Sequence, residues 1–330
     1  MTRHRLWTLA LAAAFAAALS ATGAGAQDKP VRVGYWTSGF SLGFGAVLQE
    51  EKFLEKEGLK SQFRTFSEVG APAQAVLSGD VDIAFGAPVT AGYNLAVQGA
   101  PVRIILVTQI LEGQIVVPVA SPIQAVAELK GKRIGMSRPG SATHALATAI
   151  LSANYGIEPD GYKIIPGNEG QLTQLLQRGD LDAAILRRVT IVQLPKDTVR
   201  PLADIVAEWK TLTKTDETPA LAVALTTADF LEKNPDAAVK VVKAIQKAVK
   251  FGSENKPRVA EILQSVANLA PEDATSYASV WEAGYTATLS PAAIAGLKRE
   301  NEIFVKAGAA EAIAPDWLYA DGPYKAATQQ

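Results

Sequence analysis

Apolar residues recur along the chain at two spacings, which predict strands and helices in alternation. Val31–Trp36 is an apolar, β-rich run typical of a strand, and the residues after Gly45 recur at helical spacing. We expect a glycine-rich turn between them, at Gly39, Gly43 and Gly45. The elements that follow are a helix over Gly45–Lys56, a strand over Leu59–Phe66, a helix over Pro72–Ser78 and a strand over Val81–Phe85. This alternation predicts right-handed crossovers and a parallel, doubly wound sheet.

The pattern then repeats at a period near 100 residues. Residues 79–90 (GDVDIAFGAPVT) and 179–190 (GDLDAAILRRVT) are identical at six of 12 positions, and RVGYWTSG at 32–39 resembles RIGMSRPG at 133–140. The second copy predicts strands over Arg133–Met136, Tyr162–Ile165 and Ala183–Leu186, with helices over Ser141–Ala153 and Gln171–Arg178. Two matches at the same spacing indicate two lobes of similar construction.

Two short segments are candidates for the connections between the lobes. Leu111–Gly113 separates the apolar strands Val102–Thr108 and Ile115–Ala120, and the polar stretch Thr211–Thr218 precedes another strand from Leu221. After that strand the chain is mostly helical. We therefore predict a discontinuous lobe I, from residues 27–112 and 215–330, and a lobe II from residues 113–214.

In open α/β sheets, ligands bind outside the carboxyl ends of the strands. If the two lobes face each other, the loops at those ends line a common cleft. The repeat identifies these loops as Thr37–Phe40, Ser67–Ala71, Gly86–Pro88, Ser137–Thr143, Gly167–Glu169 and Arg187–Arg188.

The loop over Ser137–Thr143 joins a strand to a helix start and carries several donors. Helix N-termini present unpaired N–H groups that suit anions, and Ser137, Arg138, Ser141 and Thr143 add hydroxyls and a positive charge. An alternative is that Ser141 only caps its helix. The loop does not match a phosphate-binding GxxxxGK[ST] motif.

Arg187 and Arg188 stand where the first copy has Ala87 and Pro88. A guanidinium fork suits carboxylate, sulfonate or phosphate groups. Two alternatives are a solvated pair and a salt bridge to a carboxylate across the cleft. Neighbouring side chains of an extended chain point in opposite directions, so we expect one arginine, Arg187 for preference, to face the ligand.

Other polar and aromatic residues near the loops have more ordinary interpretations. The GDxD aspartates are expected at turns and strand starts rather than as acids or metal ligands: Asp80, Asp82, Asp180 and Asp182. Tyr35, Trp36 and Phe40 could stack on a ligand or pack in the core.

Composition excludes several classes of function. The chain has 330 residues, with 32 Lys+Arg and 33 Asp+Glu, so it has no basic excess of the kind that binds nucleic acid. It has no cysteine, which removes disulfides, thiolate sites and lipid-anchoring cysteines, and it has two histidines, His4 and His144. We expect His144 on the surface of its helix or half-buried, with no nucleophile elbow near it.

The first 26 residues have the pattern of a cleaved secretory signal. Arg3 and Arg5 precede an apolar run over Leu6–Leu19, and Ala24–Ala26 forms a small-residue cleavage site. A membrane span needs about 20 apolar residues, more than this run supplies. We predict an exported, periplasmic protein without a lipid anchor.

These features together resemble a known family. The export signal, the repeat, AVLSGDVDIAFGAP, QGAPVRII and ELKGKRIGM followed by PGSATH are similar to periplasmic solute-binding proteins of ABC importers. The branch is the one for taurine, aliphatic sulfonates, nitrate-like anions and thiamine-pyrimidine precursors. Many members have Trp and Pro after the second GDxDxA strand, where this chain has Leu186-Arg187-Arg188. A taurine or sulfonate specificity therefore does not carry over directly.

The resemblance implies a type II-like α/β fold of two lobes, each a doubly wound sheet flanked by helices, with the ligand cleft between them. It implies capture of a small, anionic solute by hinge closure and delivery to an inner-membrane permease, without catalysis or cofactor, by a monomer that binds no nucleic acid. Alternatives are a pyrimidine or aromatic ligand, a sensor partner, and, less favoured, an enzyme on this scaffold. Carried over by position, the ligand contacts are Ser38, Gly39, Phe40, Ser67, Gly70, Gly86, Pro88, Ser137, Arg138, Ser141, Thr143, Arg187 and Arg188.

Overall fold

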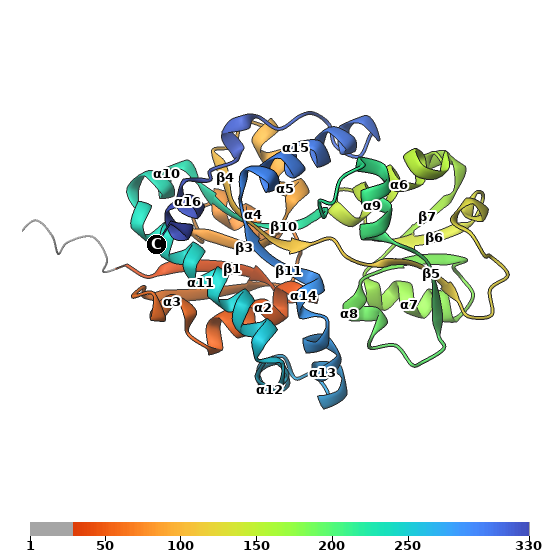
Figure 1. Cartoon of the computed structure of the whole chain (residues 1–330), viewed down its shortest axis with the longest axis horizontal. Coiled ribbons are helices and arrows are strands. Elements are labelled where there is room, and N and C mark those ends of the chain that lie inside the picture. Colours follow the sequence, from red (N-terminus) through yellow and green to blue (C-terminus); the bar gives the residue numbers. More distant parts are fainter. Residues whose placement is uncertain (1–28, 330) are drawn as a thin grey trace, which may run out of the picture.

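The computed structural model describes residues 29–329, whose strands form two sheets flanked by helices (Figure 1). The predicted signal segment lies outside the described residues. One sheet has six strands in the order β11-β4-β10-β3-β1-β2, and the other has five in the order β7-β6-β8-β5-β9. The strands of the first sheet are β1 (Val31–Trp36), β2 (Ser61–Phe66), β3 (Ile83–Pro88), β4 (Val102–Ile110), β10 (Ala220–Thr227) and β11 (Tyr285–Thr288). Those of the second are β5 (Gln114–Pro118), β6 (Arg133–Met136), β7 (Lys163–Pro166), β8 (Ala183–Leu186) and β9 (Val199–Asp204).

Helices cover both sheets, and some of them lie between successive strands of the repeat. Up to residue 191 they are α2 (Gly39–Glu50), α3 (Phe53–Lys56), α4 (Ala71–Leu77), α5 (Val89–Val97), α6 (Ala142–Tyr155), α7 (Glu169–Gln177) and α8 (Arg188–Ile191). The remainder are α9 (Ile205–Thr213), α10 (Ala228–Lys233), α11 (Pro235–Glu254), α12 (Lys256–Ala267), α13 (Pro271–Ser279), α14 (Trp281–Gly284), α15 (Pro291–Lys306) and α16 (Gly322–Thr328). Of the helices in residues 29–329, none combines the length and apolarity that a membrane span requires.

The prediction of parallel sheets is right for the repeated strands and wrong for the others. β1 pairs in parallel with β2 and β3, and β6 pairs in parallel with β7 and β8. β10 is antiparallel to β3 and β4, β11 to β4, and β5 to β8 and β9. β5 and β10, each the first strand after a crossing between the sheets, run antiparallel to both of their neighbours.

The repeated GDxD motif has the structural role expected of it. Asp82 accepts hydrogen bonds from Arg32 at the start of β1, and Asp182 accepts the equivalent bonds from Arg133 at the start of β6. Each pair joins the first and third strands of its repeat. The arginine and the second aspartate of GDxD thus have the same role in both copies.

The glycine-rich segment after β1 is helical, which corrects the predicted turn. α2 begins at Gly39, and the predicted helix over Gly45–Lys56 is divided into α2 and α3. A Cβ at Gly43 would lie less than 3.0 Å from the Tyr277 side chain, and one at Gly45 would lie equally close to Tyr35. These glycines therefore allow close packing of the helix rather than a reversal of the chain.

Two short segments connect the sheets. Residues 111–113 run from β4 to β5, and residues 214–219 run from α9 to β10 (Figure 1). Leu111 N donates to Pro219 O at 2.9 Å, so the two segments lie side by side. The first is where the sequence predicts a crossing. The sequence predicts the return crossing at Thr211–Thr218, but α9 continues to Thr213, so the non-helical part is shorter than predicted. The proposed lobe boundaries stay a prediction.

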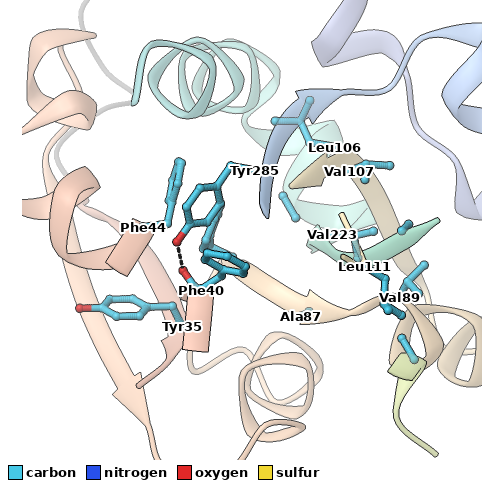
Figure 2. Packing of buried hydrophobic residues seen from close by; sticks show 14 of the residues in the cluster. Tyr35, Phe40, Phe44, Ala87, Val89, Leu106, Val107, Leu111, Val223 and Tyr285 are labelled. Atoms are coloured by element: carbon cyan, nitrogen blue, oxygen red, sulfur yellow. Dashed lines mark hydrogen bonds between the residues drawn. The ribbon is translucent and has the colours of Figure 1, made fainter. Parts of the chain in front are cut away.

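A cluster of aromatic rings fixes α2 against the six-stranded sheet. Phe44 stacks on Phe85 of β3 with 4.2 Å between ring centroids, and Trp281 lies 4.2 Å from Tyr285. Figure 2 shows Phe40 and Phe44 next to Tyr285, with Tyr35 of β1 below them in this view. Phe40 is 1% exposed, so its ring belongs to the core. The start of α2, which holds three predicted ligand contacts, is thereby anchored to the C-terminal half of the chain.

Candidate ligand site at the contact between the two sheets

Arg187 is a buried cation at the carboxyl end of β8. Its Nε donates to Glu112 Oε1 at 2.8 Å, and its guanidinium carbon lies 4.9 Å from the centre of the Phe40 ring. Phe40 belongs to α2, beside the six-stranded sheet, and β8 belongs to the five-stranded sheet. The contact therefore joins predicted ligand loops from both sheets.

One buried nitrogen of this guanidinium has no hydrogen bond to a described residue. Nη2 of Arg187 is buried, and within residues 29–329 no group accepts its protons. An unpaired buried donor costs about 1–3 kcal/mol, and more when it is charged. An acceptor placed here would remove that cost, and an anionic oxygen would do so best.

Two carboxyl groups hold the backbone and side chain around Arg187. Glu112, 1% exposed, accepts from Arg187 Nε with one oxygen and from the Arg188 backbone N–H at 2.8 Å with the other. Glu169, at the start of α7, accepts from Arg187 N at 3.3 Å and from the Thr190 hydroxyl. Burial raises the pKa of Glu169, and the charge of Arg187 opposes that rise. The strand-end segment is therefore held from both sides.

Arg188 is engaged elsewhere. Its Nη2 forms a salt bridge with Asp204, its Nε lies 3.9 Å from Glu112 Oε2, and its side chain is 38% exposed. Both arginines thus form salt bridges, Arg187 with Glu112 and Arg188 with Asp204. Of the two arginines, Arg187 is the one that lies between the sheets and has a buried nitrogen, Nη2, without a hydrogen bond to any described residue.

The loop over Ser137–Thr143 leads into α6, which begins at Ala142 as expected. Ser141 is the N-cap: its Oγ accepts from His144 N at 3.2 Å and donates to Arg138 O at 2.8 Å. Thr143 is 8% exposed, whereas Ser137 is half-buried and Arg138 is exposed. Ser141 is therefore committed to capping, and an anion at this loop would meet backbone N–H groups and Thr143.

Thr90 of α5 connects this loop to the other sheet. Its Oγ1 donates to Gly140 O at 2.9 Å. Gly140 has φ = +87°, a left-handed conformation that favours glycine. Together with the Arg187–Phe40 contact, this bond gives two direct links between the strand-end loops of the two sheets.

The remaining predicted contacts lie at the strand ends of the six-stranded sheet and differ in exposure. Ser38, Ser67 and Gly70 are exposed, and Gly39 and Pro88 are half-buried. Gly86 is buried with φ = +68°, and a Cβ there would lie within 3.0 Å of Gln109 Nε2 and closer still to Ser41 Oγ. The structure brings Gly86 close to those two side chains; it shows no contact of Ser67 or Gly70 with Arg187.

Sequence reasoning missed several polar residues at this place. Gln109 Nε2 donates to Ser41 Oγ at 3.0 Å, and both residues are 2% exposed. Glu112 and Thr90 were also not predicted as site residues, and Glu169 was predicted only as part of the cleft loop Gly167–Glu169. A signal existed for Glu112, a carboxylate in an otherwise apolar crossing segment, but its partner 75 residues away could not be read from the sequence.

Two tyrosines from the C-terminal half hold the first turn of α2. Tyr277 donates to Gly39 O at 2.9 Å, and Tyr285 donates to Phe40 O, the bond drawn in Figure 2. Their hydroxyl oxygens lie 2.8 Å apart, and burial raises the pKa of both. The predicted contacts at Gly39 and Phe40 are therefore on a rigid support.

His144 is half-buried on α6, in agreement with the sequence. Its Nδ1 is buried without a hydrogen bond to any described residue, and burial lowers its pKa. Residues 29–329 contain no cluster of three or more His, Asp or Glu side chains suited to a metal ion.

Two cavities lie away from the Arg187–Phe40 contact. One, of about 330 Å³, is lined by Arg138, Pro166 and one face of α7. The other, of about 250 Å³, lies between α15 and β10–β11 and includes Glu217 and Glu300. Of the predicted site residues, Arg138 lines the first cavity, and the second contains none.

Comparison with known proteins identifies the family. Residues 45–258 match the family described as NMT1/THI5 like. The chain belongs to the NMT1/THI5-like family. This agrees with the resemblance that the paired GDxDxA elements indicate.

Individual relatives give the fold and its range of uses. The taurine-binding periplasmic protein of Escherichia coli (strain K12) is 27% identical over 226 residues, 68% of this chain, and the match spans 65% of that protein's length. The alkanesulfonate-binding protein SsuA from Xanthomonas axonopodis pv. citri, bound to MOPS, superposes with a TM-score of 0.74 at 18% identity over 90% of this chain and 99% of that one. The desulfurization enzyme DSZB superposes with a TM-score of 0.64 at 14% identity, over 91% and 99%. Binding proteins and an enzyme therefore share this fold.

Proposed function

We propose that this protein captures a small, singly charged organic anion, with a sulfonate or carboxylate group, between its two lobes in the periplasm and delivers it to an ABC-transporter permease. The observation that supports it most is the buried Arg187 guanidinium, which has one unpartnered nitrogen where the two sheets meet. The taurine- and alkanesulfonate-binding relatives support the same class of ligand.

Magnitudes show how the site would be divided. A charge-assisted hydrogen bond from Arg187 contributes roughly 1.5–3 kcal/mol, and the N-terminus of α6 contributes up to ~2 kcal/mol when partly buried. Micromolar affinity needs about 8 kcal/mol. The balance would come from burial of the ligand's apolar part as the lobes close around it.

Hinge closure is the expected mode of capture. The segments at 111–113 and 214–219 are short, adjacent and non-helical, as hinge segments are. The contacts from Arg187 to Phe40 and from Thr90 to Gly140 would form as the lobes approach, and would exclude water from the ligand.

We propose binding without catalysis, by a monomer that binds no nucleic acid and uses no cofactor. The unpartnered group at the site is a guanidinium, a recognition group rather than a nucleophile or general base. Because a desulfurization enzyme has the same fold, the fold alone does not decide between binding and catalysis, and the absence of catalysis needs an experiment.

The decisive test is binding by the purified mature protein. Native mass spectrometry of protein isolated from its own source would identify a retained ligand. Isothermal titration calorimetry with ethanesulfonate, taurine, propionate and a hydroxymethylpyrimidine would rank the classes. We expect a sulfonate or carboxylate to bind at least tenfold more tightly than the pyrimidine. Tighter binding of the pyrimidine, or release of a chemically altered product, would reject the proposal.

A further inference from the structure

Glu112 occupies an unusual position for a buried carboxylate. It lies in the segment that connects the two sheets, yet both of its oxygens bind the strand-end segment after β8. Oε1 accepts from Arg187 Nε and Oε2 accepts from the Arg188 backbone N–H, each at 2.8 Å. A structural ion pair would be complete with a bidentate contact, in which Nε and Nη2 of one guanidinium both meet the carboxylate.

Because the two oxygens of Glu112 bind different groups, the guanidinium of Arg187 forms only one hydrogen bond with this carboxylate. Because Oε2 is occupied by the Arg188 amide, Nη2 of Arg187 stays buried and meets no acceptor among the described residues. The Phe40 ring covers the guanidinium at 4.9 Å and restricts its rotation. The side chain is therefore held in one orientation, in which the buried Nη2 has no hydrogen-bond partner within residues 29–329.

We propose that Glu112 is the positioning residue that orients Arg187 toward the anionic group of the ligand. This inference rests on the ligand-binding role proposed above for Arg187. Glu112 acts through the guanidinium and does not itself touch the ligand. Its place in the connecting segment means that the open donor is aligned by the hinge rather than by the β8 loop alone.

The surroundings of Glu112 keep this arrangement fixed. On one side, Leu111 N donates to Pro219 O at 2.9 Å, which ties the segment to the return crossing. On the other, a Cβ at Gly113 would lie less than 3.0 Å from Leu186 O, so the absence of a side chain lets the segment touch the end of β8. Glu112 thus belongs to the connecting segment and binds the strand-end segment after β8.

A double-mutant cycle tests the proposal on the full mature protein, with ethanesulfonate as the probe and calorimetry as the readout. Glu112→Gln keeps the size of the side chain but cannot accept both N–H groups equally. We expect Glu112→Gln and Arg187→Ala each to raise Kd at least tenfold. In the double variant, Kd should lie within twofold of that of Arg187→Ala, because Glu112 acts through the guanidinium.

Asp204→Asn is the matched control. Asp204 is the carboxylate of the neighbouring pair with Arg188, and it also caps α9 by accepting from Val206 N and Ala207 N. Asparagine caps helices as well as aspartate does, so the helix is preserved. This variant should bind ethanesulfonate within twofold of the parent.

Three results would overturn the inference. Binding by Glu112→Gln within twofold of the parent shows that orientation does not depend on Glu112. An equal loss from Glu112→Gln with and without Arg187 shows a general effect on the fold. A parent protein that binds none of the anions rejects the proposed function and this inference together, whereas the first two outcomes leave the function standing. If Glu112→Gln does not fold, Glu112→Asp, which keeps the charge but shortens the reach, replaces it in the same cycle.

Discussion

Arg32 and Asp82 are joined by three hydrogen bonds, and Arg133 and Asp182 reproduce them in the second repeat. The backbone N, Nε and Nη2 of Arg32 donate to the Asp82 carboxylate at 2.8, 3.1 and 2.6 Å, and those of Arg133 to Asp182 at 2.7, 3.1 and 2.9 Å. Each aspartate N–H in turn donates to the arginine carbonyl, at 2.8 and 2.9 Å. The pair therefore sets the register between the first and third strands of each repeat.

We predict that Asp82→Ala destabilises the protein more than Asp80→Ala, although both residues belong to the same GDxD motif. Asp82 loses charge-assisted bonds that include a backbone N–H, which we put at about 1–2 kcal/mol after discounting for partial exposure. Asp80 pairs with the exposed Arg64 at 3.4 Å, and its loss should cost less than about 0.5 kcal/mol. Urea denaturation measures both, and equal losses would contradict the register role.

Glu300 supports a prediction about pH. It is 1% exposed, Oε2 accepts from Ala220 N at 2.6 Å, and Oε1 lies 3.1 Å from the Tyr93 hydroxyl. That hydroxyl also lies 2.9 Å from Leu297 O. It has a single proton, so when it donates to this carbonyl its bond with Glu300 uses the proton of a neutral carboxylic acid. Burial raises the pKa of Glu300 to about 8.

The sign of the effect follows from this raised pKa. Between the unfolded pKa of Glu, near 4.5, and the folded value of about 8, the folded protein binds more protons, so its stability falls as pH rises. Gln at this position imitates the protonated acid. Glu300→Gln should therefore gain stability relative to the parent between pH 5 and 8, by up to about 1.4 kcal/mol per pH unit.

Thermal unfolding across that pH range measures the difference. Glu302, the exposed neighbour on the same helix, provides the control: Glu302→Gln should show no comparable trend. A pH-independent difference between Glu300→Gln and the parent would mean that the carboxyl group is ionised in the folded state.

The sequence predicted the repeated part of the fold because its signals are local. β6 and β8 begin and end at the residues expected, and Ser141 caps α6 at the expected place. The pattern of apolar runs and of GDxD turns determines these elements within one repeat. The family followed from the same motifs.

Long-range packing explains what the sequence did not predict. The glycines of α2 suggest a turn until Tyr277, more than 200 residues away, is seen to occupy the space beside Gly43. Likewise, nothing local distinguishes Arg187 from Arg188. The two arginines differ because they pair with carboxylates from distant parts of the chain, Arg187 with Glu112 and Arg188 with Asp204.

Gly43 offers a direct test of that packing. Alanine at a helix interior is ordinarily favoured over glycine by about 1 kcal/mol. Here the added Cβ would overlap Tyr277, and overpacking costs typically 1–3 kcal/mol. We expect Gly43→Ala to be destabilising on balance, and Gly70→Ala, where no described atom lies within 4 Å of the new Cβ, to be close to neutral. A stabilised Gly43→Ala protein would show that α2 can move away from Tyr277.

The last prediction concerns Thr90, whose hydroxyl donates to Gly140 O at 2.9 Å between the two sheets. Thr90→Val keeps the shape of the side chain and removes that one bond. A net hydrogen bond contributes about 1 kcal/mol, or roughly fivefold in an equilibrium constant. If the bond exists in the closed form and not in the open one, the loss falls on the closed form alone. Ligand affinity should then drop about fivefold, since binding requires closure.

Thr90→Val should leave the melting temperature of the ligand-free protein nearly unchanged, provided that its open form, without this bond, predominates. Calorimetry with the best anion of the panel gives the affinity, and small-angle scattering gives the closed fraction at a fixed, subsaturating concentration. Thr108→Val is the control. It removes a buried threonine hydroxyl that, unlike that of Thr90, has no hydrogen bond to a described residue, so Kd should stay unchanged. Equal affinities of Thr90→Val and the parent would mean that Thr90 and Gly140 are in contact in both forms, because the bond would then favour neither.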